Sequence, residues 1–183
     1  MSKSNSLFAL ILAFTLTSFA HAEGFTVTSS VVKAGETMTN DQVFNGFGCT
    51  GKNVSPDLKW EGAPADAKTF AVTMYDPDAP TGSGWWHWTV FNLPAGTKEL
   101  KAGASHAKGG LPKGAVQGMT DFGKSGYGGP CPPAGDKPHR YIFKVFALKD
   151  KLPLDAKAPG AMVGFYLNQL KLGEATLEAK FGR

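Results

Sequence analysis

Two segments far apart in this chain are rich in residues that bind anions or transfer protons. The first contains Asp76-Pro77-Asp78, followed by the histidine of Trp85-Trp86-His87-Trp88. The second is the glycine- and proline-rich stretch 126–133, followed by His139-Arg140-Tyr141. Imidazoles, a carboxylate and unshielded backbone N–H groups suit a phosphate-like anion. If the fold brings the two segments together, we expect a small, rigid binding pocket.

Asp76 stands at the end of a predicted strand, and Pro77 keeps its backbone out of the helical region. Its carboxylate either accepts backbone N–H groups as a turn residue or orients His87 on the neighbouring strand. The sequence leaves both interpretations of Asp76 open. Asp78 is expected to stabilise the turn.

The two histidines occupy similar positions, each beside a glycine- or proline-rich loop at the start of an apolar run. Strict alternation places His87 on the opposite face from Trp86 and Trp88, and places His139 and Tyr141 on a shared face. His87 is either a satisfied core residue or a site residue, since a lone histidine among aromatics permits both.

The elements expected around these residues are mostly strands. Period-two alternation or dense runs of β-branched and aromatic residues predict strands at 25–32, 69–75, 87–93, 141–148 and 175–181. The strand 69–75 is apolar enough to be central and buried on both faces. Helical spacing predicts one helix at 161–172, ended by Gly173. These elements favour a mainly β fold, an antiparallel β-sandwich with one or two peripheral helices.

The N-terminus has the pattern of a signal peptide. Lys3 precedes an apolar stretch too short to span a membrane, and Ala20-His21-Ala22 is typical of a cleavage site. We expect cleavage after Ala22, one mature domain at 23–183, and a periplasmic or secreted protein without stable membrane insertion. Its lysines are scattered, which argues against nucleic acid as a partner.

Cys49 and Cys131 are the two cysteines of the chain. An even number in an exported protein favours a disulfide, with two free buried thiols as the alternative. Neither cysteine has a second one nearby, so the sequence predicts no zinc site. No other metal or cofactor is expected.

Binding is favoured over catalysis. A hydrolase using His87 and His139 as an acid–base pair is the alternative. However, the sequence holds no serine in a nucleophile-elbow pattern and no His-Glu-x-x-His metal motif.

Taken together, the segments resemble the phosphatidylethanolamine-binding protein family. The resemblance lies in 76–80, in Trp85-x-His87 and in Gly129-x-x-Pro132-Pro133 leading to His139-Arg140-Tyr141. The variant Gly-Tyr-Gly-Gly-Pro-Cys-Pro-Pro at 126–133, with 47–56 upstream, resembles the bacterial YbhB/YbcL branch, also labelled Raf-kinase-inhibitor-like.

The resemblance implies a β-sandwich with a large central sheet, a smaller second sheet and a pocket for phosphate, phosphoryl head groups or carboxylates. In that pocket both histidines would donate N–H groups, and Asp76 would fix an imidazole tautomer. Because the family includes inhibitors, a role as inhibitor or modulator of an unidentified protein partner stays open, and the aromatic loops are compatible with a homodimer. The implied ligand-binding residues are Asp76, Trp85, His87, Gly129, Pro132, His139 and Tyr141.

Overall fold

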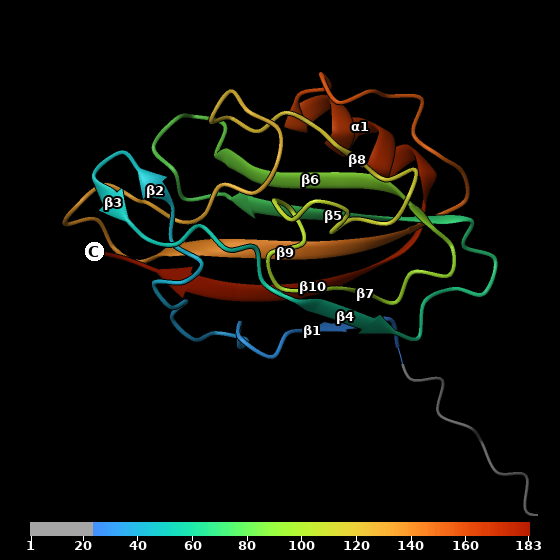
Figure 1. The fold of residues 1–183 in the computed structure, drawn as a ribbon, viewed down its shortest axis with the longest axis horizontal. Coiled ribbons are helices and arrows are strands. Elements are labelled where there is room, and N and C mark those ends of the chain that lie inside the picture. The colour runs from blue at the N-terminus through green and yellow to red at the C-terminus, as the bar shows by residue number, and fades with distance from the viewer. Residues whose placement is uncertain (1–23) are drawn as a thin grey trace, which may run out of the picture.

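A five-stranded antiparallel sheet is the central layer of the molecule (Figure 1). The computed structural model describes residues 24–183, so the expected signal peptide lies outside the described residues. The strands of this sheet, in spatial order, are β10 (Lys171–Phe181), β9 (His139–Leu148), β5 (Thr69–Asp76), β6 (Trp85–Pro94) and β8 (Val116–Gln117).

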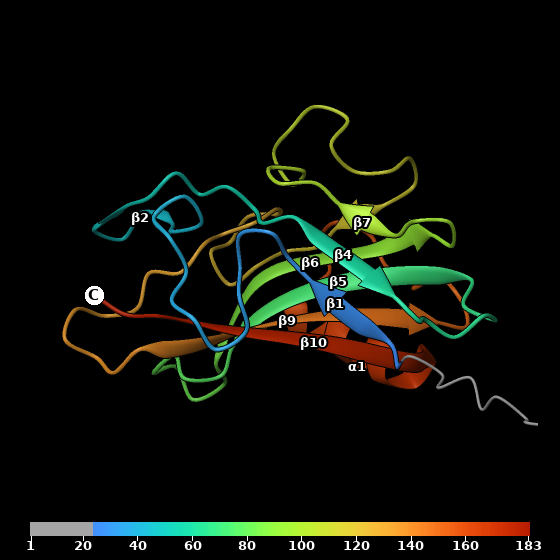
Figure 2. The same ribbon diagram turned by 90° about the horizontal axis from the view of Figure 1, so that it is seen from below.

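A smaller sheet and a helix cover the two faces of the central sheet. The smaller sheet contains β1 (Thr26–Thr28), β4 (Leu58–Glu61) and β7 (Glu99–Leu100), and it lies in front of the large sheet in Figure 2. Helix α1 (Gly160–Leu170) lies on the opposite face. A short hairpin, β2 (Asn45–Gly46) and β3 (Cys49–Thr50), extends from one end. The predicted mainly β sandwich is confirmed, with one helix in residues 24–183.

The core consists of two apolar clusters separated by the large sheet. Phe70, Val72 and Met74 of β5 pack toward the smaller sheet, while Ala71 packs toward α1. The prediction that this strand is central and buried on both faces is therefore confirmed. Such a strand is a rigid support for the residues at its end.

The first predicted strand is much shorter than expected, because side chains capture the amides beyond Thr28. The Asp57 carboxylate accepts the Ser30 N–H at 2.9 Å, and the Ser29 hydroxyl accepts the Val32 N–H at 3.0 Å. These local hydrogen bonds compete with the ladder and end β1.

The predicted end of the helix was also wrong. Helix α1 ends at Leu170, and Lys171 is already extended and pairs with Leu148 as the first residue of β10. The Leu170 carbonyl accepts the Lys149 N–H at 3.0 Å, so the helix end needs no glycine cap. Gly173 lies instead at a register shift within β10. No helix in residues 24–183 is both long enough and apolar enough to span a bilayer.

Candidate functional site

The two segments singled out in the sequence meet at one end of the central sheet. Because β5 is antiparallel to both neighbours, its last residues lie beside the first residues of β6 and β9. Asp76 pairs with Trp85 in this register. The end of β5 and the starts of β6 and β9 therefore carry Asp76, Trp85, His87, His139 and Tyr141 together.

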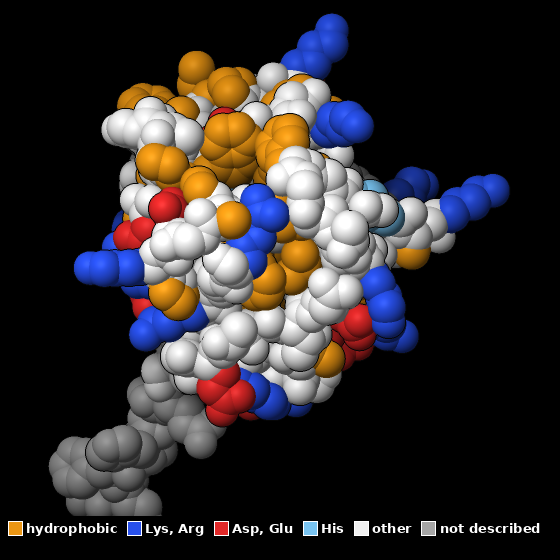
Figure 3. Space-filling view, turned by 90° about the vertical axis from the view of Figure 1, so that its left-hand side faces the viewer, with side chains coloured by type: hydrophobic (Ala, Val, Ile, Leu, Met, Phe, Trp, Pro, Cys, Tyr) orange, Lys and Arg blue, Asp and Glu red, His pale blue; other side chains and the backbone are white. Residues whose placement is uncertain are grey.

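A cavity of about 150 Å³ opens at this end of the sheet. Figure 3 looks onto this end of the molecule, where hydrophobic side chains gather. Six of the seven residues implied by the resemblance line the cavity; Gly129 does not. The lining residues are Phe47, Asp76, Ala79, Pro80, Thr81, Trp85, His87, Phe122, Cys131, Pro132, Pro133, His139 and Tyr141.

Asp76 orients His139 rather than His87. One oxygen of its buried carboxylate lies 2.8 Å from His139 Nδ1. The other oxygen accepts the backbone N–H groups of Asp78 and Ala79 at 2.8 and 3.0 Å. Asp76 is therefore a turn residue that also orients a histidine, but this histidine is His139 and not the expected His87. Because Nδ1–H donates to Asp76, His139 keeps its Nε2 edge for other partners, with Asp136 Oδ2 3.5 Å away.

Asp78 supports this arrangement from outside the cavity. It accepts both the backbone N–H and the guanidinium of Arg140. The Arg140 guanidinium lowers the pKa of the Asp78 carboxyl to about 2, so this pair is charged at neutral pH. It connects the turn after β5 to the start of β9, as expected for a turn residue.

His87 is oriented by the glycine loop. Its Nδ1 lies 2.7 Å from the Gly128 carbonyl oxygen, and the Gly128 N–H donates back to the His87 carbonyl at 2.9 Å. Burial lowers the pKa of His87 to about 4, although the Gly128 carbonyl opposes this shift. At neutral pH the ring is uncharged, with its proton on Nδ1. His87 therefore offers a ligand the Nε2 lone pair instead of the expected N–H group.

A bulge in β6 separates the tryptophans on either side of His87. Met74 pairs with Trp88 and Tyr75 with Trp86, so two neighbouring residues of β5 pair with residues that are two apart in β6. Trp86 packs on Tyr75 with ring centroids 4.8 Å apart, on the helix side of the sheet. Trp88 belongs to the core on the other side. Uniform alternation therefore failed here, because a bulge redirects the side chains around it.

The glycine loop does not form the anion-binding nest that its sequence predicts. The Tyr127 N–H donates to the Ser105 hydroxyl, and the Gly129 N–H donates to the Asn53 side-chain oxygen at 2.8 Å. The Gly128 N–H is used by His87. Gly129 is required for packing, since a Cβ atom there would overlap the Gln42 carbonyl oxygen.

Two buried donors on residues that line the cavity make no well-formed hydrogen bond within the described structure: Trp85 Nε1 and the Tyr141 hydroxyl, which has the Asp76 carboxylate nearby. Burial raises the pKa of Tyr141, and the charge of Asp76 raises it further, so the hydroxyl stays protonated. Leaving such a group unpaired in a protein interior costs on the order of 1–3 kcal/mol. Both donors are therefore available to a ligand that accepts hydrogen bonds.

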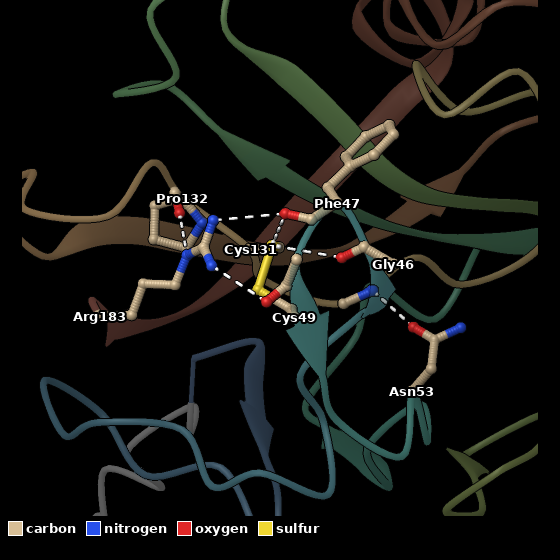
Figure 4. Close-up of a disulfide and its surroundings, with 9 residues drawn as sticks. Gly46, Phe47, Cys49, Asn53, Cys131, Pro132 and Arg183 are labelled. Carbon is tan, nitrogen blue, oxygen red and sulfur yellow. Dashed lines mark hydrogen bonds between the residues drawn. A yellow bond between two sulfur atoms is a disulfide. The ribbon is translucent and has the colours of Figure 1, made fainter.

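The predicted disulfide is present, and it forms part of the cavity wall. Cys49 and Cys131 are bonded, with Cα atoms 6.0 Å apart and a sequence separation of 82. Figure 4 shows the bridge beside Phe47, Pro132 and Arg183. Residues 24–183 contain no free cysteine, so the alternative of two free thiols was wrong.

Sequence reasoning missed the aromatic wall of the cavity, Phe47 and Phe122. Their rings lie 5.7 Å apart between centroids, and Phe122 also contacts the His87 ring edge to face at 5.3 Å. A signal for Phe47 did exist. It stands two residues before Cys49, and a bridge to Cys131 brings it next to Pro132.

The comparisons with known proteins agree with this fold and site. The family model described as "Phosphatidylethanolamine-binding protein" matches residues 28–182. The UPF0098 protein YbcL of Escherichia coli K12 is 54% identical over 169 residues, covering 91% of this chain and 92% of YbcL. The UPF0098 protein YbhB of the same organism is 49% identical, covering 82% of this chain and 95% of YbhB.

Solved structures give the same result. The crystal structure of E. coli YbcL, described as a member of the mammalian PEBP family, superposes with a TM-score of 0.85 at 55% identity, covering 87% of this chain and 98% of that one. The putative PEBP homologue CT736 of Chlamydia trachomatis gives a TM-score of 0.74 at 27% identity, with coverage of 87% and 98%. The chain therefore belongs to the phosphatidylethanolamine-binding protein family, with YbcL and YbhB as close relatives.

Proposed function

We propose that the mature protein binds a small oxyanion, a phosphoryl group or a carboxylate, in the cavity at the ends of β5, β6 and β9. The observation that carries this proposal is a pair of buried donors without a well-formed partner, Trp85 Nε1 and the Tyr141 hydroxyl, on two residues that line the cavity together with both histidines. An anionic oxygen would accept from both donors, and charge-assisted hydrogen bonds are stronger than neutral ones.

Binding without turnover is part of this proposal. An acid–base pair needs a nucleophile or an activated water beside it. The hydroxyl of Thr81 donates to the Gly84 carbonyl, and Cys131 is held in the disulfide. Neither is available as a nucleophile for the histidines, which favours a binding protein over a hydrolase.

We also propose that the protein acts outside the cytoplasm. The disulfide supports this location, because such bonds persist in oxidising compartments and are rare in the cytosol. The expected signal peptide points the same way.

Replacing Tyr141 with phenylalanine tests the binding proposal. We expect Tyr141→Phe to weaken binding of inorganic phosphate about tenfold, because one hydrogen bond to a charged ligand is lost. Without ligand, Tyr141→Phe should be no less stable than wild type, and more stable by up to about 1–3 kcal/mol, because it removes a buried hydroxyl that has no partner. Calorimetric titration with phosphate, phosphorylethanolamine and acetate measures the affinities, and thermal unfolding measures the stability.

Tyr127→Phe is the matched control, because Tyr127 is equally buried but its hydroxyl donates to the Gln42 carbonyl at 3.0 Å, outside the cavity wall. This variant should lose about 1 kcal/mol of stability and keep its affinity for phosphate. If wild type binds none of the three ligands, or if Tyr141→Phe binds them as tightly as wild type, the proposal is wrong.

A further inference from the structure

A second cavity, of about 400 Å³, lies next to the first one. The rings of Phe47 and Phe122 line both cavities, so they form the partition between them. The rest of its lining comes from the β2–β3 hairpin, from Asn53 and His106, and from the loop 120–128. The binding proposal above does not involve this second cavity.

One wall of the second cavity is aromatic. Phe44 stacks on Phe122 with ring centroids 4.3 Å apart, and Phe47 lies 5.6 Å from Phe44 and 5.7 Å from Phe122. Phe47 is 67% exposed, so this cluster of three rings is open to solvent. Aromatic rings attract another ring beyond the area that it buries. Such a wall therefore suits an aromatic side chain, the common anchor of a protein–protein interface.

The opposite wall consists of glycine-rich backbone that is held in a fixed position. The Tyr127 N–H donates to the Ser105 hydroxyl at 2.7 Å. A Cβ atom at Gly126 would lie 3.4 Å from His106 Nε2, so the imidazole packs closely over this glycine. Asn53 donates to the Tyr127 carbonyl at 3.1 Å. The cavity is therefore already formed in the absence of a partner, which lowers the ordering cost of binding.

Basic side chains surround the second cavity. His106 and Lys124 line it, and no Asp or Glu is among the described residues that do so. His106 belongs to the segment between β7 and β8, whose residues 101–113 we call the basic loop. This loop contributes Lys101, Lys108 and Lys113, and it contains no Asp or Glu. Figure 2 shows that it projects from the body of the molecule.

The carboxylates that flank this region in sequence have other partners. Asp121 accepts the Trp86 N–H at 2.7 Å, and Asp41 pairs with Lys52 at 2.8 Å. Within residues 24–183, no ion pair joins Lys124 or a lysine of the basic loop to a carboxylate. The positive charge of this face is therefore available to attract an acidic partner.

We propose that this face docks an acidic segment of a partner protein, which inserts one aromatic side chain into the second cavity. Its carboxylates would lie against Lys124 and the basic loop, and its ring would pack against Phe44 and Phe122. The charge selects an acidic partner, and the rings select the anchor. This inference goes beyond the proposed function and does not depend on it.

Calorimetric titration at low ionic strength with a seven-residue peptide, phenylalanine between three glutamates on each side, tests the inference. We expect the same peptide with alanine at its centre to bind wild type about tenfold more weakly, because the buried ring is lost. Lys124→Glu should bind the phenylalanine peptide about fivefold more weakly, since an attraction becomes a repulsion. The matched control is Lys157→Glu, the same charge change at an exposed position near the start of α1. It should weaken binding less than about twofold.

Phe44→Leu distinguishes the second cavity from the first, because Phe44 lines only the second. This variant keeps an apolar side chain but loses the stacked ring, so it should bind the phenylalanine peptide about threefold more weakly. Its affinity for the alanine peptide should stay the same. Thermal unfolding of each variant shows that the fold is retained. An unchanged affinity of Phe44→Leu for the phenylalanine peptide would place the ring outside the second cavity and overturn the inference.

The other outcomes are equally decisive. Equal affinities of wild type for the two peptides would exclude an aromatic anchor. Equal losses in Lys124→Glu and Lys157→Glu would reduce the effect to the net charge of the protein. If the phenylalanine peptide does not bind, whereas phosphatidylglycerol vesicles bind wild type and not Lys124→Glu, the face belongs to an anionic lipid surface instead. Absence of binding by both probes would also overturn the inference.

Discussion

Asp76→Ala is expected to lower the free energy of unfolding by about 3–5 kcal/mol, the range found when one partner of a buried, hydrogen-bonded pair is removed. The Asp76 carboxylate serves His139 with one oxygen and the N–H groups of Asp78 and Ala79 with the other. Alanine leaves all three donors without their acceptor. Because His139 also loses its orientation, binding of phosphate should fall below detection. Urea unfolding and calorimetric titration measure the two effects.

Asp136→Ala is the matched control for this experiment. Asp136 is the other carboxylate beside His139, 3.5 Å from Nε2, but its side chain is 44% exposed. An exposed carboxylate of this kind contributes about 1 kcal/mol or less even when it is paired with a charge, so this variant should remain nearly as stable as wild type. If both variants lost the same free energy of unfolding, Asp76 would contribute no more than an exposed carboxylate does. That result would contradict the structure.

Loss of the disulfide is expected to lower the free energy of unfolding by about 4 kcal/mol. The bridge joins residues 82 apart, and in the chain-entropy model a loop of this length restricts the unfolded chain by that amount. The double variant Cys49→Ala/Cys131→Ala should also bind phosphate more weakly, because Cys131 of the cavity wall is no longer tied to Cys49. Chemical unfolding of wild type, with and without a dithiol reductant, gives the stability difference directly.

The double alanine variant also controls for effects of the reductant itself. Its unfolding midpoint should be the same with and without the dithiol, and close to that of reduced wild type. A reduced wild type within about 1 kcal/mol of the oxidised protein would contradict a stabilising role for the bridge.

The arrangement of the site could be predicted wherever it depends on the sequence pattern of single strands and on the antiparallel order of the strands in the sheet. The dense strand 69–75 and the runs that begin at His87 and His139 are periodic enough to be recognised as strands. In an antiparallel sheet the end of one strand must meet the starts of its neighbours. Asp76 and the two histidines therefore had to be close once β5 lay between β6 and β9.

The hydrogen-bond partners of these residues could not be predicted, because they are determined by a bulge, a loop and a turn where the backbone is irregular. The bulge in β6 changes the direction of Trp86 relative to Trp88, and no residue type in that run marks a bulge. His87 is oriented by the carbonyl of Gly128, a backbone atom 41 residues away. Asp76 bonds to His139 with one carboxylate oxygen while the turn after β5 binds the other. Alternation assigns faces of a strand, but it does not assign such hydrogen bonds.

The resemblance had a similar limit. It identified six residues that line the cavity, and it included Gly129, whose amide is bound to Asn53. It contained Phe47 in its upstream motif but not as a site residue, and it did not contain Phe122. Residues that shape the outer part of the cavity were therefore found only from the structure.

The indole N–H signals in a ¹H–¹⁵N NMR spectrum provide the most direct test of the central claim, that an oxyanion binds the unpartnered donors of this cavity. Trp60 Nε1 is also buried without a partner, but it lies in the core and does not line the cavity, so it serves as an internal control. On titration with phosphate, we expect the Trp85 indole N–H resonance to move downfield and saturate while the Trp60 resonance stays in place. A Trp85 signal that does not move at saturating phosphate, or one that moves together with that of Trp60, would contradict the account.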